Sequence, residues 1–175
     1  MSTTFGYDPS MASEDTVTTD DVRWLTDDEQ VAWRAFVNGS RRLMERLERD
    51  LKTHGLSHDD YGVLVVLSER EDGRLRMSEL ADLSVESRSR LSHHIGRMEA
   101  NGLVARESCP TDRRGSWAVL TDKGRALMEE TSKHHVAGVR AYFLDQVRPE
   151  ELCMIASAFG RIDDAFGPEG RCPGT

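Results

Sequence analysis

The chain has 175 residues, a length that suits one domain or one domain with an added dimerisation module. Apolar residues make up 38% of it and charged residues 31%, which is ordinary for a soluble globular protein. No apolar run approaches the ~20 residues of a membrane span, and no secretory segment follows Met1, so we expect a cytoplasmic protein without a membrane partner.

The net charge of −8 is concentrated at the N-terminus. Residues 1–30 contain eight acidic residues and one basic residue, so this segment carries −7 and the rest of the chain only −1. Binding to a polyanion depends on a local basic patch rather than on total charge. The acidic total therefore does not exclude nucleic acid as a partner.

Both ends of the chain have the composition of tails. Residues 1–21 are rich in Ser, Thr and Asp without an apolar period, which predicts a disordered acidic tail. Residues 167–175, GPEGRCPGT, predict a flexible tail.

A long helix follows the first tail. Thr26 and Glu29 have the spacing of a capping box, and apolar residues then recur at helical spacing until Gly55. This predicts a helix over about residues 27–54. Such a long helix with one apolar stripe usually buries that stripe against another chain or a bundle.

Short elements come next. We expect a helix from about Ser57, an edge strand within 74–78, a helix capped by Ser78, and a helix from about Ser87 to Asn101-Gly102. The segments LVARES (103–108) and SWAVLT (116–121) then predict a β-hairpin with the loop CPTDRRG (109–115).

Two further helices complete the pattern, one over about 121–147 with Thr121 as its cap and one that begins at Pro149. The middle of the first helix, EETSKHH (129–135), is polar on every side, which predicts a strut that crosses solvent between two lobes.

Two short helices followed by a hairpin predict a winged helix-turn-helix. The expected fold class is therefore mainly α with a small β-wing. Residues 57–120 form the DNA-binding domain in this scheme, and residues 22–56 and 121–166 form a helical dimerisation lobe.

The second short helix has a cationic face. Residues 87–97, SRSRLSHHIGR, include three arginines and two histidines but no acid. Leu91, Ile95 and Met98 fall on one arc of the helical wheel. Arg90, His93 and Arg97 fall roughly opposite, with Ser89 beside them, as a helix in a major groove requires.

The chemistry of this face suits DNA. Arginine can donate two parallel hydrogen bonds to guanine, and serine hydroxyls at a helix N-terminus suit phosphate oxygens. The alternative is a solvated cationic face, but such faces normally alternate in sign, and residues 87–97 offer no acid. Gly96 in mid-helix predicts that another group approaches closely there.

The hairpin loop adds Arg113 and Arg114, which we expect to be exposed at the tip and fixed by Asp112. A wing arginine can enter a minor groove, where A·T tracts deepen the negative potential.

Residues 78–124 resemble the MarR family of bacterial transcriptional regulators, and EQVAWRAF (29–36) resembles the first helix of its actinobacterial members. The similarity extends over about residues 22–166. Its landmarks are Leu80-Ala81, Met98-Glu99, Gly102-Leu103-Val104, Asp112-x-Arg114 and Leu120-Thr121-x-x-Gly124.

The resemblance implies a homodimer built from the three long helices that binds a palindromic operator, with Arg114 as the minor-groove arginine and Asp112 as its support. The residues that match recognition-helix positions are Ser87, Arg88, Arg90, Ser92, His93 and Arg97. The chain departs from the family pattern in the turn LSVES (83–87), which has no glycine and holds Ser84 and Glu86 in place of apolar residues.

Members of this family often release DNA in response to a small phenolic acid or an oxidant. Trp33, Phe36 and Tyr61 could line a crevice for a small aromatic effector, or they could be packing residues. Cys109 lies near Arg106 and Arg113, which would lower the pKa of its thiol, so it is either a redox-sensitive or a passive loop residue.

We expect no metal site and no cofactor. The pairs His93-His94 and His134-His135 are adjacent, so their side chains point about 100° apart. Zinc-type cysteine spacing is also missing. We read His134 and His135 as solvated residues of the strut.

Three classes of function compete. The sequence favours a sequence-specific transcriptional regulator, a repressor more than an activator, that binds double-stranded DNA as a homodimer. The alternative is a winged-helix interaction module that binds an acidic protein. An enzyme is disfavoured, because the sequence has no GxGxxG or GxSxG motif and no nucleophile beside a base.

Overall fold

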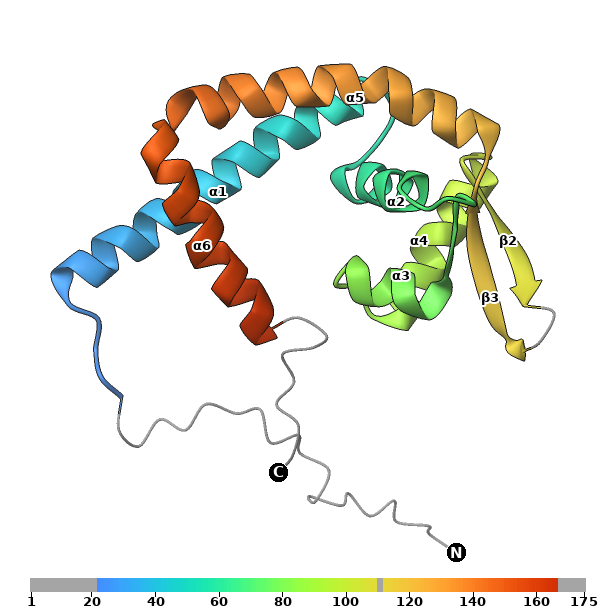
Figure 1. The fold of residues 1–175 in the computed structure, drawn as a ribbon, viewed down its shortest axis with the longest axis horizontal. Coiled ribbons are helices and arrows are strands. Elements are labelled where there is room, and N and C mark those ends of the chain that lie inside the picture. The colour runs from blue at the N-terminus through green and yellow to red at the C-terminus, as the bar shows by residue number, and fades with distance from the viewer. Residues whose placement is uncertain (1–21, 110–111, 167–175) are drawn as a thin grey trace, which may run out of the picture. The chain divides into compact units, whose positions relative to one another are not determined.

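The computed structural model describes residues 22–109 and 112–166 (Figure 1). The chain divides into two compact units, Met1–Asn38 and Gly39–Thr175, which are treated separately below. The tails predicted at 1–21 and 167–175 lie outside the described residues. Within the described ranges, no helix has both the length and the apolar character needed to cross a bilayer.

The first unit consists of the start of α1 (Asp27–Lys52) and the residues before it. The predicted capping box is present. The Thr26 amide donates to Oε2 of Glu29 at 2.8 Å, and the Glu29 amide donates to Oγ1 of Thr26 at 3.3 Å. The rings of Trp33 and Phe36 lie 5.7 Å apart in this unit, and both side chains are exposed.

In the second unit, α1 ends at Lys52, two residues earlier than predicted, and Gly55 follows with a φ of 77°. α2 (His58–Ser68) begins with a capping box in which the Asp60 amide donates to the Ser57 hydroxyl at 3.0 Å. The Asp60 carboxylate accepts from the Ser57 amide, also at 3.0 Å. This box places the Asp60 side chain at the N-terminus of α2.

The helix-turn-helix follows. β1 (Arg74–Arg76) leads directly into α3 (Met77–Leu83), and α4 (Arg88–Ala100) comes after a short turn. The predicted cap at Ser78 is wrong. Because β1 continues into the helix without a turn, α3 starts at Met77, and Arg76 is its N-cap residue without a capping side chain.

The turn between α3 and α4 contains Val85 with a φ of 53°, the single non-glycine residue with positive φ among the described residues. Its side chain is 94% exposed. The turn therefore adopts a left-handed conformation, although the sequence has no glycine there.

The sheet has the strand order β1-β3-β2 and is antiparallel, with β2 at Val104–Cys109 and β3 at Asp112–Leu120. The predicted edge strand is confirmed as β1. The predicted loop at 109–115 is too long, because the register shifts after Ser108 and Cys109 pairs with Asp112. Pro110 and Thr111 lie outside the described residues, as do the side chains of Cys109 and of 112–114.

α5 (Asp122–Tyr142) is shorter than predicted and is followed by a 3₁₀ turn at Leu144–Gln146 and by α6 (Pro149–Phe166). The prediction that Thr121 caps α5 is confirmed, because its hydroxyl accepts from the Gly124 amide at 3.0 Å.

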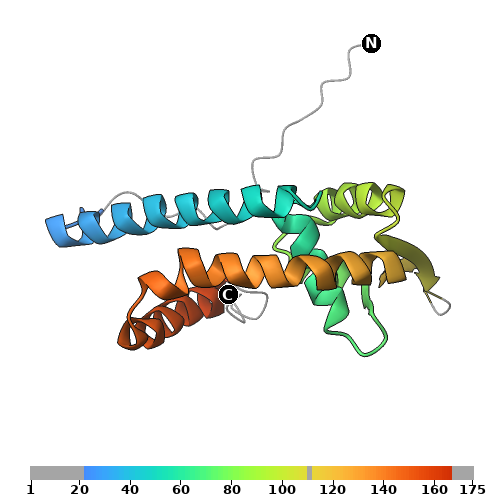
Figure 2. The same cartoon turned by 90° about the horizontal axis from the view of Figure 1, so that it is seen from above.

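The expectation of a solvent-crossing strut is wrong. Thr131 is fully buried, and a Cβ on Gly138 would lie 3.3 Å from Cδ2 of Leu47. α5 lies beside the C-terminal half of α1 (Figure 2). Gly138 in the C-terminal part of α5 therefore allows close packing against α1, which the hydropathy pattern alone does not reveal.

The core of the second unit lies among α2, α3, α4 and the sheet. Residues of α2 and α4 contribute most of its largest fully buried side chains, and α1, the segment before α2, α3 and β2 contribute the others. The members are Leu51, Leu56, Tyr61, Val63, Leu64, Leu67, Leu75, Leu80, Ala81, Leu91, Ile95, Met98, Leu103, Val104, Ala118 and Leu120. α4 thus has one face fixed on the fold.

Candidate DNA-binding surface

The two faces predicted for α4 are present. Leu91, Ile95 and Met98 are at most 1% exposed and belong to the core. The side chains of Arg90 and Arg97 are 72% and 62% exposed. The cationic side of the helix is therefore accessible, while its apolar side is held by the fold.

The remaining candidates on α4 are also accessible. Ser87 is the N-cap residue, and its hydroxyl accepts from the Arg90 amide at 3.3 Å. The other four candidates are exposed: Arg88, Ser89, Ser92 and His93.

One end of this surface is a groove between the start of α3, the start of α4 and the wing strands. Three arginines line it. Its lining residues are Arg76, Met77, Ser78, Arg88, Ser92, Arg106, Gly115 and Ser116. Guanidinium and hydroxyl groups along one groove suit the phosphate backbone of a nucleic acid.

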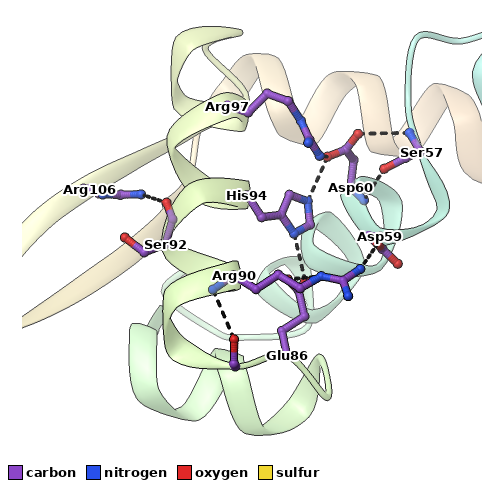
Figure 3. Close-up of polar contacts among 10 residues, drawn as sticks. Ser57, Asp59, Asp60, Glu86, Arg90, Ser92, His94, Arg97 and Arg106 are labelled. Carbon is purple, nitrogen blue, oxygen red and sulfur yellow. Dashed lines mark hydrogen bonds and ion pairs between the residues drawn. The ribbon is translucent and has the colours of Figure 1, made fainter. Parts of the chain in front are cut away.

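The close approach predicted at Gly96 comes from the chain itself. A Cβ on Gly96 would lie 3.4 Å from the Arg106 guanidinium. This guanidinium donates to the Ser92 carbonyl (Figure 3). Gly96 thus leaves room for a side chain that ties β2 to α4.

The arginines of α4 are paired with acids from outside residues 87–97. The Arg97 guanidinium lies 3.2 Å from Oδ1 of Asp60. Arg90 lies 3.5 Å from Oε2 of Glu86 and 3.8 Å from Oδ2 of Asp59. The expectation that these cations have no acid to pair with holds for the helix sequence and is wrong for the folded chain, because α2 supplies two carboxylates.

A buried histidine lies behind the cationic face. His94 Nε2 is 2.8 Å from Oδ1 of Asp60, and Nδ1 is 2.9 Å from Oε1 of Glu86 (Figure 3). The side chains of His94, Asp60 and Glu86 are 5%, 14% and 7% exposed. Three elements meet at this imidazole: α2, the turn before α4, and α4 itself.

The ionisation of this cluster follows from its contacts. The hydrogen bond to Asp60 raises the pKa of His94; burial opposes this, and the bond to Glu86 adds to it. Burial raises the pKa of Asp60, but hydrogen bonds from His94, from Ser57 and from Arg97 outweigh it and hold that pKa well below its usual range. Both shifts favour an imidazolium beside the Asp60 carboxylate.

Sequence reasoning missed this cluster. The available signal was Glu86, which stands in the inter-helix turn where the family has an apolar residue. The structure supplies the reason for that departure, since the Glu86 carboxylate is buried and paired with His94.

The predicted wing residues are described by their backbone. Asp112, Arg113 and Arg114 lie at the start of β3 and Cys109 at the end of β2, but their side chains are outside the described part of the chain. Their roles in DNA contact, wing support and redox sensing stay predictions.

The predicted effector residues fall in different units. Tyr61 is 8% exposed and belongs to the core, with its ring 4.6 Å from that of His135. This contact favours a packing role for Tyr61. The effector crevice with Trp33 and Phe36 remains a prediction.

The reading of both strut histidines as solvated is wrong for His135. It is partly buried, burial lowers its pKa, and its Nδ1 atom has no hydrogen-bond partner among the described residues. His134 is exposed. In the described ranges, no group of three His, Cys, Asp or Glu side chains has an arrangement that could hold a metal ion.

Known proteins share this architecture. The model of the MarR family matches residues 54–115. The chain is 49% identical to AbsC, a MarR family transcriptional regulator from Streptomyces coelicolor, with a TM-score of 0.79 over 82% of this chain and 97% of that chain. It is 39% identical to Sco3205 of the same organism, crystallised in complex with DNA, with a TM-score of 0.82 over 88% and 98%.

Curated relatives agree with these matches. The chain is 25% identical to the HTH-type transcriptional regulator MhqR of Bacillus subtilis over 122 residues, which cover 70% of this chain and 82% of that protein. It is 24% identical to the HTH-type transcriptional repressor YetL of Bacillus subtilis over 126 residues, 70% of this chain and 75% of that protein.

The similarity to AbsC and Sco3205 extends over nearly the full length of both proteins. It agrees with the two-faced α4 and the three-stranded sheet of this chain. The chain therefore belongs to the MarR family of transcriptional regulators.

Proposed function

We propose that this chain represses transcription by binding a palindromic DNA duplex as a homodimer, with one α4 helix of each protomer in the major groove. The observation that carries the proposal is the two-faced α4, which buries Leu91, Ile95 and Met98 and exposes Arg90, His93 and Arg97. The DNA complex of Sco3205 supports it, and the name of YetL supports repression.

Arg90, Arg97 and His93 are the groups that read bases in this proposal. They lie on the outer side of α4, away from the core. An arginine with a good bidentate contact to guanine discriminates by ~1–3 kcal/mol against a wrong base. Ser89 contributes a hydroxyl on the same side.

In this proposal the contacts to the phosphate backbone of the DNA come from the basic groove beside the wing. Arg88 and Ser92 line this groove together with Arg76 and Arg106. The N-terminus of α4, which begins after Ser87, contributes the positive end of the helix dipole. Arg113 and Arg114 extend the surface toward the minor groove, with Asp112 as support.

The homodimer is supported by apolar side chains that each unit exposes. In the first unit Val31, Trp33 and Phe36 are exposed, and in the second unit α6 exposes Met154 and Ile162. Large apolar side chains exposed on helices favour a protein partner that covers them. A two-fold dimer would present two α4 helices to two half-sites about one helical turn apart.

The test is selection of duplexes from a random pool by the full-length protein, followed by gel shift with the selected sequence. We expect a palindrome of ~16–20 bp with half-sites about one turn apart. Affinity should fall linearly with salt on logarithmic axes. If no sequence is enriched while the protein captures acidic polypeptides, the alternative function as an interaction module replaces this proposal.

A further inference from the structure

His94 has a polar partner on each ring nitrogen, and both partners are carboxylates. Neither carboxylate can donate a proton when ionised, so two hydrogen bonds at 2.8 and 2.9 Å require both ring nitrogens to donate. Only the imidazolium form does this. Two ionised partners at these distances therefore point to a charged histidine at a nearly solvent-free position.

The imidazolium adds directional bonds between α2, the turn before α4 and α4 itself to the packing of the hydrophobic core. Asp60 is fixed by the capping box at the start of α2, and Glu86 lies in the left-handed turn that leads into α4. A directional bond on each side of the His94 ring opposes rotation of α4 about its own axis. Such a rotation would change where Arg90 and Arg97 point.

The same cluster also determines how strongly Arg97 is held by the protein. His94 and Arg97 share the Oδ1 atom of Asp60. With His94 protonated, the charge of this carboxylate is offset by a second cation. With His94 neutral, the carboxylate attracts Arg97 alone, and Arg97 must break a stronger ion pair before it can contact DNA.

We propose that His94 is the positioning residue of the recognition helix and couples DNA binding to proton binding: as an imidazolium between Asp60 and Glu86 it fixes α4 and frees Arg97 for the duplex. The inference rests on the proposed DNA-binding function. When His94 loses its proton to solvent, one of the two hydrogen bonds is lost and DNA affinity falls.

The direction of the pH effect follows from all charged groups at this position. Asp60 and Asp59 face the cluster from α2, Glu86 from the turn, and Arg90 and Arg97 from α4. The hydrogen bond to Asp60 raises the pKa of His94, so affinity declines as pH rises through that raised pKa.

The first experiment needs no DNA. The imidazole of His94 is titrated by NMR in the full chain, with its signals assigned by comparison with His94→Gln. We expect a pKa above the ordinary value of about 6.5 and a lower pKa in Glu86→Gln, which keeps the shape of the side chain and removes one partner charge. An unshifted His94, or one that Glu86→Gln does not move, overturns the proposal.

The second experiment measures binding to the duplex selected by the wild-type protein, at constant ionic strength, over a pH series that starts below the ordinary histidine range. We expect wild-type affinity to fall about 3- to 10-fold across the His94 titration. In Glu86→Gln the midpoint of this fall moves to lower pH. His94→Gln binds about 10-fold more weakly at low pH and lacks the pH dependence.

His93 provides the matched control, because it is the neighbouring histidine on the exposed side of the same helix. His93→Gln must keep the pH dependence, whatever its effect on affinity. If His93→Gln removes the dependence, or if His94→Gln retains it, the proton-linked role of His94 is refuted.

The outcomes also separate this inference from the proposed function. If the wild type selects no duplex, the DNA-binding proposal fails, and the role of His94 for DNA fails with it. If a duplex is selected and bound equally well at every pH, only the inference about His94 fails. A merely structural role would lower the stability of His94→Gln without moving the midpoint in Glu86→Gln.

Discussion

Arg97 and His94 bind the same atom, Oδ1 of Asp60, at 3.2 and 2.8 Å. One side chain comes from the exposed face of α4 and the other from its buried side. The free protein thus holds a candidate base-reading arginine in an ion pair that has to be exchanged for DNA. Because the Arg97 side chain is 62% exposed, this exchange requires no unfolding.

Arg97→Ala should reduce sequence discrimination. We expect a loss of ~1–3 kcal/mol at one base step and a smaller loss on unrelated duplexes. Binding to a panel of single-base variants of the selected duplex measures this. Arg88→Ala is the matched comparison, since a phosphate contact weakens all sequences alike and lowers the salt slope by about 1. A uniform loss for Arg97→Ala would show that Arg97 contacts phosphate.

The stability of the fold should decline at both ends of the pH scale. Asp60 has a lowered pKa, so its contribution is present above the unfolded value of about 4 and is lost as pH falls through the folded one. His94 has a raised pKa, so its contribution is lost as pH rises through that pKa.

Asp60→Asn tests both limbs of this profile. We expect it to lower the free energy of unfolding at neutral pH by about 3 kcal/mol, because it removes one of the two carboxylates that pair with a buried cation. Urea denaturation over a pH series measures the effect. The control is Asp59→Asn, its exposed neighbour, for which we expect a change below about 1 kcal/mol. Equal effects of the two variants would contradict the role of the cluster.

Val85→Asn should stabilise the protein. Val85 is β-branched and has a φ of 53°, a left-handed conformation that asparagine tolerates better. We expect the free energy of unfolding to rise by about 1 kcal/mol. Val136→Asn on α5 is the control, because it exchanges the same residues on an exposed helical surface and should change stability by only a few tenths of a kcal/mol. A destabilised Val85→Asn would show that the turn carries no strain.

Gly124→Ala should destabilise the junction between β2 and α5. A Cβ at Gly124 would lie 2.1 Å from the Leu103 carbonyl oxygen, which is backbone and cannot move aside. We expect a loss of about 2 kcal/mol in urea denaturation. Gly62→Ala in α2, where nothing lies within 4 Å of the new Cβ, should instead gain up to about 1 kcal/mol. Similar effects of the two substitutions would rule out the steric explanation.

Ile162→Asp should break the proposed homodimer. Ile162 lies on α6 and is 51% exposed in the single chain. A charge at a buried interface position is strongly unfavourable, so we expect a monomer by sedimentation and a loss of binding to the palindrome. Leu83→Asp, equally exposed but on α3, should leave the dimer intact. A dimeric Ile162→Asp protein would exclude this part of α6 from the interface.

Much of the architecture followed from local patterns. Ser57, Ser87 and Thr121 cap the helices that their positions predicted, because a capping hydroxyl acts on amides two or three residues away. The apolar and cationic faces of α4 could also be predicted, because helical periodicity assigns each side chain to a face without knowledge of the neighbouring elements.

Features that depend on contacts between separate helices or strands were predicted less accurately. The stretch 129–135 of α5 looks polar all round in sequence, yet Thr131 within it is buried. Gly138, which follows this stretch, is also buried and allows a close approach of α1. The wing loop was predicted too long, since the register shift that joins Cys109 to Asp112 depends on strand pairing.

The sequence by itself determined the kind of protein: a capped helical chain with a short wing and a helix that is apolar on one side and cationic on the other. Only the tertiary structure decided which acids meet that helix. Asp60 lies 34 positions before His94, and helical periodicity gives no information about contacts between separate elements. Packing of α2 against α4 places the carboxylate beside the imidazole, and their hydrogen bond favours the proton on His94 against the opposing effect of burial.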